Sequence, residues 1–323
     1  MPPQIRIPET LQGSLRCPVC RANLRLVDQH IACTNPACDT RFPVVDGIPV
    51  ILNERSSVFS IDDFVSHRDG FFGNQQESSL KNAVRRSIPA ISKNIKGKSN
   101  YTRLTQFLLR ESVAPRVLVL GGSILGQGME PLARNTSIEL LESDVSFGPR
   151  TALICDAHDI PFEDGTFDGV IAQAVLEHVA DPPRCCEEIF RVLKDRGIVY
   201  AETAFMQQVH GGRYDFTRFT HLGHRRLFRK FEEIDSGAVC GPGMALAWSY
   251  EYFLLSFASS RTMRRVISAF AAFTSFYLKY LDHYLINRPG ALDAASGLYF
   301  MGRKPGKDLT DKELIALYRG AGS

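Results

Sequence analysis

Short apolar runs that alternate with helix-like segments constrain the fold of this chain most. Such runs occur at 116–122, 138–146, 153–155 and 198–202, and another ends at Ile171. Strands that are joined by helices run parallel, because a crossover is needed to bring each strand beside the previous one. The pattern therefore predicts five strands of a doubly wound α/β sheet, with a ligand crevice at their carboxyl ends. Apolar runs at 231–241 and 297–302 predict a sixth and a seventh strand.

The residues that follow these strands are of types that suit a nucleotide-like ligand. The first strand ends at Gly121 and Gly122, where the missing side chains let the backbone approach a ligand closely. The second ends in acidic residues, and a carboxylate there can accept hydrogen bonds from both hydroxyls of a ribose. Glu142 and Asp144 are both candidates for that position, and Asp156 stands at the tip of the third strand.

Residues 156–203 carry a more specific pattern. An acid, an Ile-Pro-Phe step, a Phe-Asp before an apolar strand, Glu-His-Val, and Arg-Val-Leu-Lys before a glycine follow one another in this order. The stretch resembles the core of class I S-adenosylmethionine-dependent methyltransferases of the small-molecule type. The resemblance implies a Rossmann-like seven-stranded sheet and S-adenosylmethionine as cofactor. NAD is the alternative cofactor, but its G-x-G-x-x-G fingerprint is absent.

The resemblance also implies roles for individual residues. The methionine end of the cofactor would lie against the glycines, its ribose on the acid of the second strand, its adenine at the third strand, and its methyl end near the fourth. The residues are Gly121, Gly122, Gly126, Asp144, Asp156, Ala157 and Gln173. Val119 and Ser123 depart from the family pattern. Only eleven residues separate Asp144 from Asp156, which predicts that the helix between those strands is shortened or missing.

Four cysteines near the start, Cys17, Cys20, Cys33 and Cys38, have the spacing C-x2-C-x12-C-x4-C. Thiolates in this arrangement suit a closed tetrahedral Zn²⁺ site of structural type, and we prefer that interpretation to free or redox-active thiols. The motifs CPVC, CTNPAC and FPVVDGIPVIL resemble the small zinc-ribbon subunit that partners tRNA and protein methyltransferases. Asp46-Gly47 predicts a tight turn there. Residues 1–56 are therefore expected to form a zinc-ribbon domain.

The segment 57–110 is expected to be a basic linker and helix. The first 110 residues carry 15 Lys and Arg against 9 Asp and Glu, whereas the remainder carries 23 against 26. The basic side chains of the segment are Lys81, Arg85, Arg86, Lys93, Lys96, Lys98, Arg103 and Arg110. Such a stretch fits either a solvated linker or an anionic partner. An RNA (rRNA or tRNA) methyltransferase that uses the ribbon and this linker is thus the alternative function.

The stretch HGGRYDFTRFTH directly follows the fifth strand, where such enzymes form the acceptor pocket. His210 could act as a base for an oxygen acceptor with Asp215 as its orienter, while Tyr214 is presented from the same loop. Arg218 could grip an anionic group of the substrate, or Asp215 and Arg218 could pair to pin the loop; both interpretations stay open. Thr220 predicts a helix start. His224, Arg225 and Arg226 are expected on a solvated face of that helix.

The methyltransferase domain is expected to span 111–306, with a helical insertion at 244–286 and a tail at 307–323. The insertion would act as a lid, a dimer interface or a peripheral membrane contact. We favour the first two, because Glu251 and Lys279 interrupt segments that fall short of a clean span. The first dozen residues lack the apolar core of a signal peptide, which predicts a cytoplasmic location, with the inner face of a membrane as an option. A further resemblance to methyltransferases of polysaccharide assembly implies a small or glycan-like acceptor.

Overall fold

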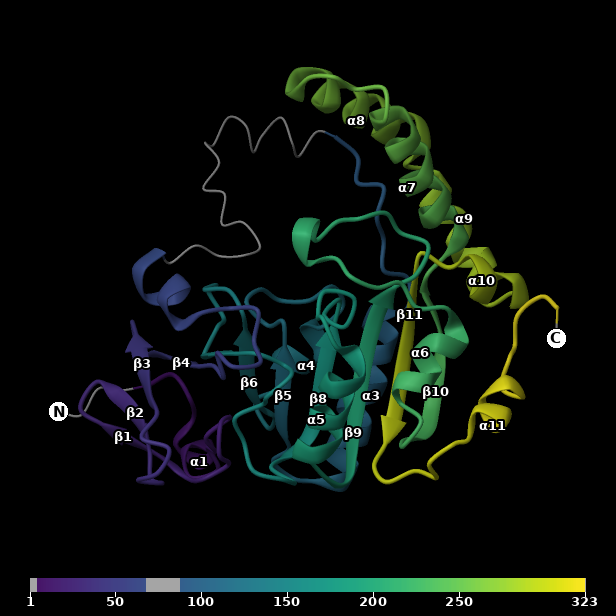
Figure 1. Cartoon of the computed structure of the whole chain (residues 1–323). Coiled ribbons are helices and arrows are strands. Elements are labelled where there is room, and N and C mark those ends of the chain that lie inside the picture. The colour runs from purple at the N-terminus through teal and green to yellow at the C-terminus, as the bar shows by residue number, and fades with distance from the viewer. Residues whose placement is uncertain (1–4, 68–87, 323) are drawn as a thin grey trace.

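A computed structural model describes residues 5–67 and 88–322 of the chain. Its core is one continuous sheet with the strand order β1-β2-β3-β4-β7-β6-β5-β8-β9-β11-β10 (Figure 1). The bounds of the strands are as follows: β1 Leu24–Val27, β2 His30–Cys33, β3 Arg41–Val45, β4 Ile48–Ile51, β5 Arg116–Leu120, β6 Glu139–Asp144, β7 Leu153–Cys155, β8 Phe167–Gln173, β9 Leu193–Ala204, β10 Glu232–Cys240 and β11 Gly297–Arg303.

The seven strands predicted from the apolar runs are confirmed as β5 to β11. The strands β7, β6, β5, β8 and β9 are parallel neighbours, and β11 pairs antiparallel with both β9 and β10. No helix joins β6 to β7, which confirms the prediction drawn from the short spacing of Asp144 and Asp156. The result is a Rossmann-like α/β fold whose parallel strands end at one edge.

The expectation of a seven-stranded sheet is incomplete, because the N-terminal strands extend it to eleven. The strand β4 runs parallel to β7, with Val50 beside Ile154 and Ile51 beside Cys155. The predicted turn at Asp46-Gly47 is confirmed: both residues have positive φ, and Val45 faces Ile48 across it. One buried cluster unites apolar residues of 5–51 with those of the parallel sheet. Residues 5–51 are thus packed as part of the main core.

Helices cover both faces of the parallel sheet, because alternate residues of each strand point to opposite sides. Leu118 of β5 packs in the cluster that contains α5, whereas Val117 and Val119 pack in the cluster that contains α3. The bounds of the helices are as follows: α1 Glu9–Gln12, η1 Asp63–His67, α3 Gly97–Glu111, α4 Glu130–Ala133, α5 Pro182–Val192, η2 Gly212–Tyr214, α6 His221–Leu227, α7 Pro242–Leu255, α8 Arg261–Ser275, α9 Leu278–Leu285, α10 Pro289–Ala294 and α11 Asp311–Ile315.

Between β10 and β11, α7 to α10 form what we call the helical arm (residues 242–294), which projects away from the sheet (Figure 1). The buried carboxylate of Asp282 on α9 accepts the amide protons of Gly243 and Met244 at 2.7 and 2.9 Å, so it caps the first turn of α7. Lys279, also buried, donates to the carbonyl oxygen of Ala90. These contacts fix the arm on the segment that precedes α3. Within the described residues, no helix has both the length and the apolarity to cross a bilayer.

The C-terminal segment 307–323, expected as a tail, contains the short helix α11. A capping box between Thr310 and Glu313 starts this helix. Beyond it, Arg319 donates to the hydroxyl of Ser236 at 2.6 Å and so ties the segment to β10. The signal for this helix was present in the sequence Thr-Asp-Lys-Glu, which has the capping-box spacing.

Candidate active site

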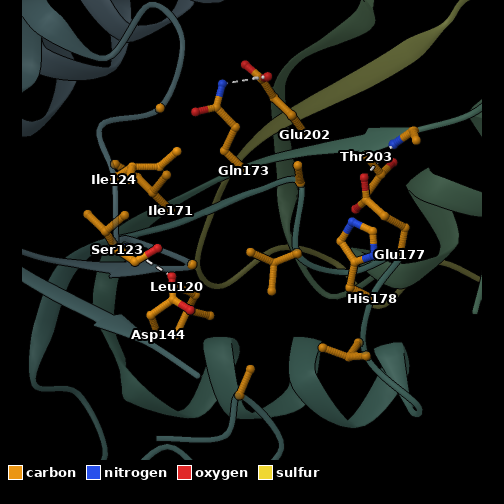
Figure 2. A pocket seen from close by; sticks show the side chains of 18 of the residues that line it. Leu120, Ser123, Ile124, Asp144, Ile171, Gln173, Glu177, His178, Glu202 and Thr203 are labelled. Carbon is orange, nitrogen blue, oxygen red and sulfur yellow. Dashed lines mark hydrogen bonds between the residues drawn. The ribbon is translucent and has the colours of Figure 1, made fainter. Parts of the chain in front are cut away.

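A cavity of about 520 Å³ opens at the carboxyl ends of the parallel strands. Six of the seven residues predicted to bind the cofactor line it: Gly121, Gly126, Asp144, Asp156, Ala157 and Gln173. The seventh, Gly122, is not among the lining residues; its amide instead donates to the carbonyl oxygen of Ser143 at 2.8 Å, which holds the end of β5 against β6. Figure 2 shows Asp144 and Ser123 on one side of the cavity and Glu177 and His178 on the other.

The glycines of the loop after β5 are required by close packing. Gly121 has a φ of +71°, and a Cβ atom there would lie 2.6 Å from a methyl group of Val175. A Cβ atom on Gly126 would lie 1.8 Å from the side-chain oxygen of Gln173. The positive φ and the contact with Val175 therefore require glycine at position 121, whereas a side chain at position 126 would displace the Gln173 side chain.

Asp144 is the acid that faces the cavity. Its buried carboxylate accepts the amide proton of Ser123 at 2.9 Å, and burial raises its pKa against that hydrogen bond. Glu142 instead accepts from Nε of Arg150 at 2.6 Å and is not among the lining residues. Of the two acids between which the sequence left the choice open, Asp144 is therefore the one that faces the cavity.

The side of the cavity next to Asp156 is closed by a segment that the sequence analysis assigned to the linker. Val58 and Phe59 line the cavity, and the hydroxyl of Ser57 donates to Asp156 at 2.5 Å. The other oxygen of Asp156 accepts from the amide of His158 at 3.0 Å. The carboxylate of Asp156 therefore anchors the chain that follows β4 as well as lining the cavity. The pairing of β4 with β7 places this segment beside the cavity. No local sequence motif predicted that position.

A second buried acid, Glu202 at the end of β9, lies at the same edge as Gln173 (Figure 2). One of its oxygens accepts from the side-chain amides of Gln173 and Asn94, both at 2.9 Å, and the other from Tyr200 at 2.5 Å. Burial raises the pKa of Glu202 to about 7 against these hydrogen bonds. The sequence analysis missed Glu202, although its place at the end of the fifth strand was the available signal.

The loop 210–218 divides into two parts. His210 and Tyr214 line the cavity, as expected for an acceptor site. Asp215 and Arg218 are not among the lining residues and bind each other, with Nη2 of Arg218 at 2.9 Å from Asp215. Asp215 also accepts the amide protons of His210 and Gly211 at 2.7 and 3.1 Å. Of the two open interpretations, these contacts match the pinning of the loop.

The charge of Asp215 follows from the same contacts. Burial opposes ionisation, but the Arg218 guanidinium and the two amides outweigh it and lower the pKa of Asp215 below its ordinary value. The carboxylate is therefore a fixed anion rather than a proton carrier near neutral pH. Asp215 and Arg218 hold His210 in place without facing the reacting groups.

Two histidines and a glutamate converge at the side of the cavity that the loop 210–218 lines. Nε2 of His178 lies 3.1 Å from Nε2 of His210, and the rings meet edge to face. Glu177 is buried; one carboxylate oxygen accepts the amide proton of Ala204 at 3.0 Å. The other, Oε2, is buried without a hydrogen-bond partner among the described residues. The sequence analysis had assigned His178 no chemical role.

The helix predicted to start at Thr220 is confirmed, since the Thr220 side chain caps α6 by accepting the amide proton of Gly223 at 3.1 Å. The prediction that three residues of this helix face solvent is wrong for two of them. His224 and Arg225 are buried, and burial lowers the pKa of His224 to about 3. Arg225 donates to Glu233 at 2.9 Å and to two backbone carbonyl oxygens. Only Arg226 is exposed as expected.

The four N-terminal thiols gather at one point. Sγ of Cys17 lies 3.9 Å from that of Cys38, and Sγ of Cys20 lies 3.4 Å from that of Cys33. All four sulfurs lie within 4.8 Å of one another. Sulfurs about 2.3 Å from a tetrahedral Zn²⁺ would be about 3.8 Å apart, so the donor set has the chemistry and size for that ion. His30 is exposed, as expected for a residue outside the donor set.

Comparison with known proteins places a methyltransferase domain in this chain. A family model described as a methyltransferase domain matches residues 123–201. A demethylmenaquinone methyltransferase of Symbiobacterium thermophilum is 38% identical over 85 residues, which are 26% of this chain and 32% of the relative. The chain thus spans about a third of the length of this curated relative.

The solved structures with a similar fold have low sequence identity to this chain. The [4+2]-cyclase SpnF is 19% identical with a TM-score of 0.38, covering 70% of this chain and 91% of its own. A phosphoethanolamine N-methyltransferase 2 of Haemonchus contortus, in complex with phosphomonomethylethanolamine and S-adenosylhomocysteine, is 16% identical with a TM-score of 0.43, covering 76% and 67%. At these scores the likeness carries no argument about this chain. The assignment of a class I methyltransferase domain rests on the family match together with the sheet and cavity described above.

Proposed function

We propose that this methyltransferase domain transfers the methyl group of S-adenosylmethionine to an oxygen atom of a small or glycan-like acceptor. One observation carries the proposal: six of the seven predicted cofactor residues line the same cavity as His178 and as His210 and Tyr214 of the loop 210–218. The sulfonium cofactor brings an already activated methyl group, so the protein has chiefly to align the acceptor and assist removal of its proton. His178, His210 and Tyr214 are the polar groups that the cavity offers for this purpose.

The residues of the cavity fit the cofactor chemically. Asp144 offers a carboxylate for the ribose hydroxyls, and Val58 and Phe59 offer apolar surface for the adenine. Glu202 and Gln173 supply a negative and a polar group where the ammonium of the methionine part would lie. Gly121, Gly126, Asp156 and Ala157, together with these residues, make up the proposed cofactor site.

Transfer from labelled S-adenosylmethionine tests the proposal. The zinc-loaded protein is incubated with fractionated glycan, lipid and small-molecule extracts, and the labelled product is examined for an ether or ester methyl group. We expect label in at least one fraction. As a control, replacement of His283, an exposed residue of the arm, should leave the yield of labelled product unchanged. Tight cofactor binding without transfer in any fraction would point to a binding protein, and an N-methyl product would refute the oxygen acceptor.

We also propose that the four cysteines hold a structural Zn²⁺, with Cys17, Cys20, Cys33 and Cys38 as its ligands. Four sulfur donors leave no open position, which suits a structural rather than a catalytic ion. The region 17–38 contains only short strands and has little hydrophobic core of its own. Its local turns alone would therefore not keep it folded. The ion would therefore supply part of the stability of the region.

We propose that the helical arm contacts an anionic membrane surface. Each of its three longer helices carries exposed apolar side chains at helical spacing, which soluble surfaces rarely present in such number. They include Leu246 and Phe253 on α7, Phe270 and Phe273 on α8, and Tyr280 and Tyr284 on α9. The helix α8 starts with Arg261, Arg264 and Arg265, all exposed, and its sequence contains no acid. Aromatic side chains with arginines beside them match anionic lipid headgroups better than a second copy with the same positive charge.

Sedimentation with vesicles checks this contact. The protein should bind phosphatidylcholine vesicles that contain about a third phosphatidylglycerol, and added salt should weaken binding. Because each arginine near such a surface contributes about 1 kcal/mol, Arg264→Gln with Arg265→Gln should weaken binding roughly 30-fold. The matched change Arg116→Gln with Lys194→Gln, on the sheet, should have no effect. Absence of binding, with a concentration-dependent dimer that Phe270→Ser disrupts, would instead assign the arm to a second copy.

Such a contact would suit the acceptor site. Met244, near the start of α7, lines the cavity, and Tyr252 of the same helix donates to the carbonyl oxygen of Val209, next to His210, at 2.7 Å. The helix thus runs from the cavity to the exposed aromatic residues. An acceptor with an apolar part could reach the cavity along this helix, and the relative of Symbiobacterium is named for a quinone substrate.

RNA as the acceptor gains no specific support from the structure. Lys81, Arg85 and Arg86 lie outside the described residues. Arg103 is bound to Asp235, and Lys93 lies 2.9 Å from His283. Arg110 lies over the ring of Phe107, while Lys98 is exposed. Steeply salt-dependent RNA binding that is lost on neutralising Lys93, Lys96 and Lys98 would revive this alternative.

A further inference from the structure

The structure assigns a divalent metal site to Glu177, His178 and His210 at the acceptor end of the cavity, and we propose that the ion binds the oxygen of the acceptor. One ligand atom from each residue can be chosen so that all three lie within 4.8 Å of one another. All three residues line the cavity, so an ion there would keep positions open for a substrate. The site is separate from the group of four cysteines.

The surroundings of the two rings indicate which nitrogen of each carries the proton and which could bind an ion. Nδ1 of His178 lies 3.0 Å from the carbonyl oxygen of Tyr214, which only accepts, so Nδ1 must carry the proton. Nδ1 of His210 lies 3.2 Å from the carbonyl oxygen of Gln208 and 3.6 Å from the carboxylate of Asp215. A donor, Nη2 of Arg218, lies at 3.4 Å but already donates to both of those groups. Acceptors thus favour a proton on Nδ1 of His210 too.

The consequence is that both Nε2 atoms present lone pairs to each other at 3.1 Å. Two lone pairs at this distance repel unless a cation lies between them. Two imidazole nitrogens bound to one ion at about 2.1 Å, with an angle between 90° and 109°, are about 3.0 to 3.4 Å apart. The observed separation falls within this range. Histidine ligands typically donate their other N–H to a carbonyl oxygen, as both do here.

Glu177 completes the site from an independent direction. Its Oε2 atom is buried and has no hydrogen-bond partner among the described residues, and a buried unsatisfied carboxylate oxygen in a native fold calls for an ion or a water. Two neutral imidazoles and one carboxylate leave a bound divalent ion with a net positive charge. This donor set suits Mn²⁺, Fe²⁺, Co²⁺ or Zn²⁺, whereas the four thiols select Zn²⁺.

The role in transfer rests on the proposed function. An acceptor hydroxyl that binds the ion loses its proton to solvent more readily, because the ion stabilises the resulting oxygen anion. That oxygen then forms a bond to the methyl carbon as the bond from carbon to the sulfonium sulfur breaks. The products are the methylated acceptor and neutral S-adenosylhomocysteine. The site therefore favours acceptors with a hydroxyl beside a second oxygen, such as a diol or a hydroxy-carbonyl group, which can chelate an ion.

Binding of Mn²⁺ tests the site without any need for turnover. The protein is loaded with one equivalent of Zn²⁺ per chain, which the four thiolates take in preference, and is then titrated with Mn²⁺. The free Mn²⁺ is measured by electron paramagnetic resonance, since Mn²⁺ competes poorly for thiolates. We expect one Mn²⁺ per chain. His210→Gln and Glu177→Gln should each weaken it at least 30-fold, and His283→Ala, which removes an exposed histidine of the arm, should leave it unchanged. Unaltered circular dichroism and retained zinc would show that the variants fold.

The result separates this inference from the proposed function. Absence of Mn²⁺, Co²⁺ and Zn²⁺ binding beyond the zinc of the cysteines would overturn the metal site, and a strongly deshielded proton in the NMR spectrum would then identify a proton shared by the two rings. Binding that survives both substitutions would place the ion elsewhere and would also overturn it. If the ion binds as expected while no acceptor is methylated, the site stands and the proposed transfer falls.

Discussion

Cys20→Ser is expected to lower the melting temperature by about 10 °C and to weaken binding of S-adenosylmethionine at the same time. Loss of one ligand of a structural zinc ion costs several kcal/mol, and each kcal/mol shifts the melting temperature of a domain of this size by about 2 to 4 °C. The effect should reach the cofactor because β4 pairs with β7, and the chain that follows β4 places Val58 and Phe59 in the cavity. Differential scanning calorimetry and cofactor titration measure the two effects.

The matched control is His30→Ala, which changes an exposed residue between the two cysteine pairs and should alter neither quantity. Removal of zinc by a chelator should reproduce both effects in the unaltered chain, and added Zn²⁺ should reverse them. A Cys20→Ser variant that melts normally and binds the cofactor normally would show that the thiols have no structural metal.

Asp144→Ala should weaken binding of S-adenosylmethionine by about 10- to 100-fold. Hydrogen bonds to a charged group contribute roughly 1.5 to 3 kcal/mol, and each 1.4 kcal/mol is a factor of ten in affinity. The substitution also removes the acceptor for the amide of Ser123, which lies 2.9 Å away and belongs to the loop that lines the cavity. Isothermal titration calorimetry at constant pH measures the change.

Glu142→Gln serves as the comparison for Asp144→Ala. It alters an acid on the same strand that binds Arg150 instead of facing the cavity, so cofactor affinity should change by less than about twofold. If both variants lost cofactor affinity equally, the assignment of Asp144 as the ribose partner would be wrong. Unchanged affinity in Asp144→Ala would remove this cofactor site altogether.

The strands of the parallel sheet could be predicted because each contains a short apolar run, and because a glycine or an acid stands at the end of β5, β6 and β7. Gly121, Asp144 and Asp156 were placed at the cavity by this pattern alone. The N-cap at Thr220 and the turn at Asp46 were predictable for a similar reason, because their backbone geometry depends on local residues. Local chemistry thus predicts the elements and the residues at their ends.

The contributions that depend on long-range packing could not be predicted in this way. Pairing of β4 with β7 joins residues about 100 positions apart and brings Phe59 to the cavity. His224 and Arg225 were expected in solvent because the helix sequence is polar, yet the partners that bury Arg225 lie on the following strand and turn. The convergence of His178 with His210 likewise depends on how the loop after β9 folds back over β8.

The parallel pairing of β4 with β7 has a consequence for how this protein is assembled. An exposed sheet edge invites pairing with other chains, and β4 occupies the edge of β7. When a segment that completes a cavity belongs to a separate subunit, its occupancy falls on dilution; a covalently joined segment has an effective concentration in the millimolar range or above. The part of the cavity wall that Val58 and Phe59 complete should therefore not depend on how much protein the cell makes.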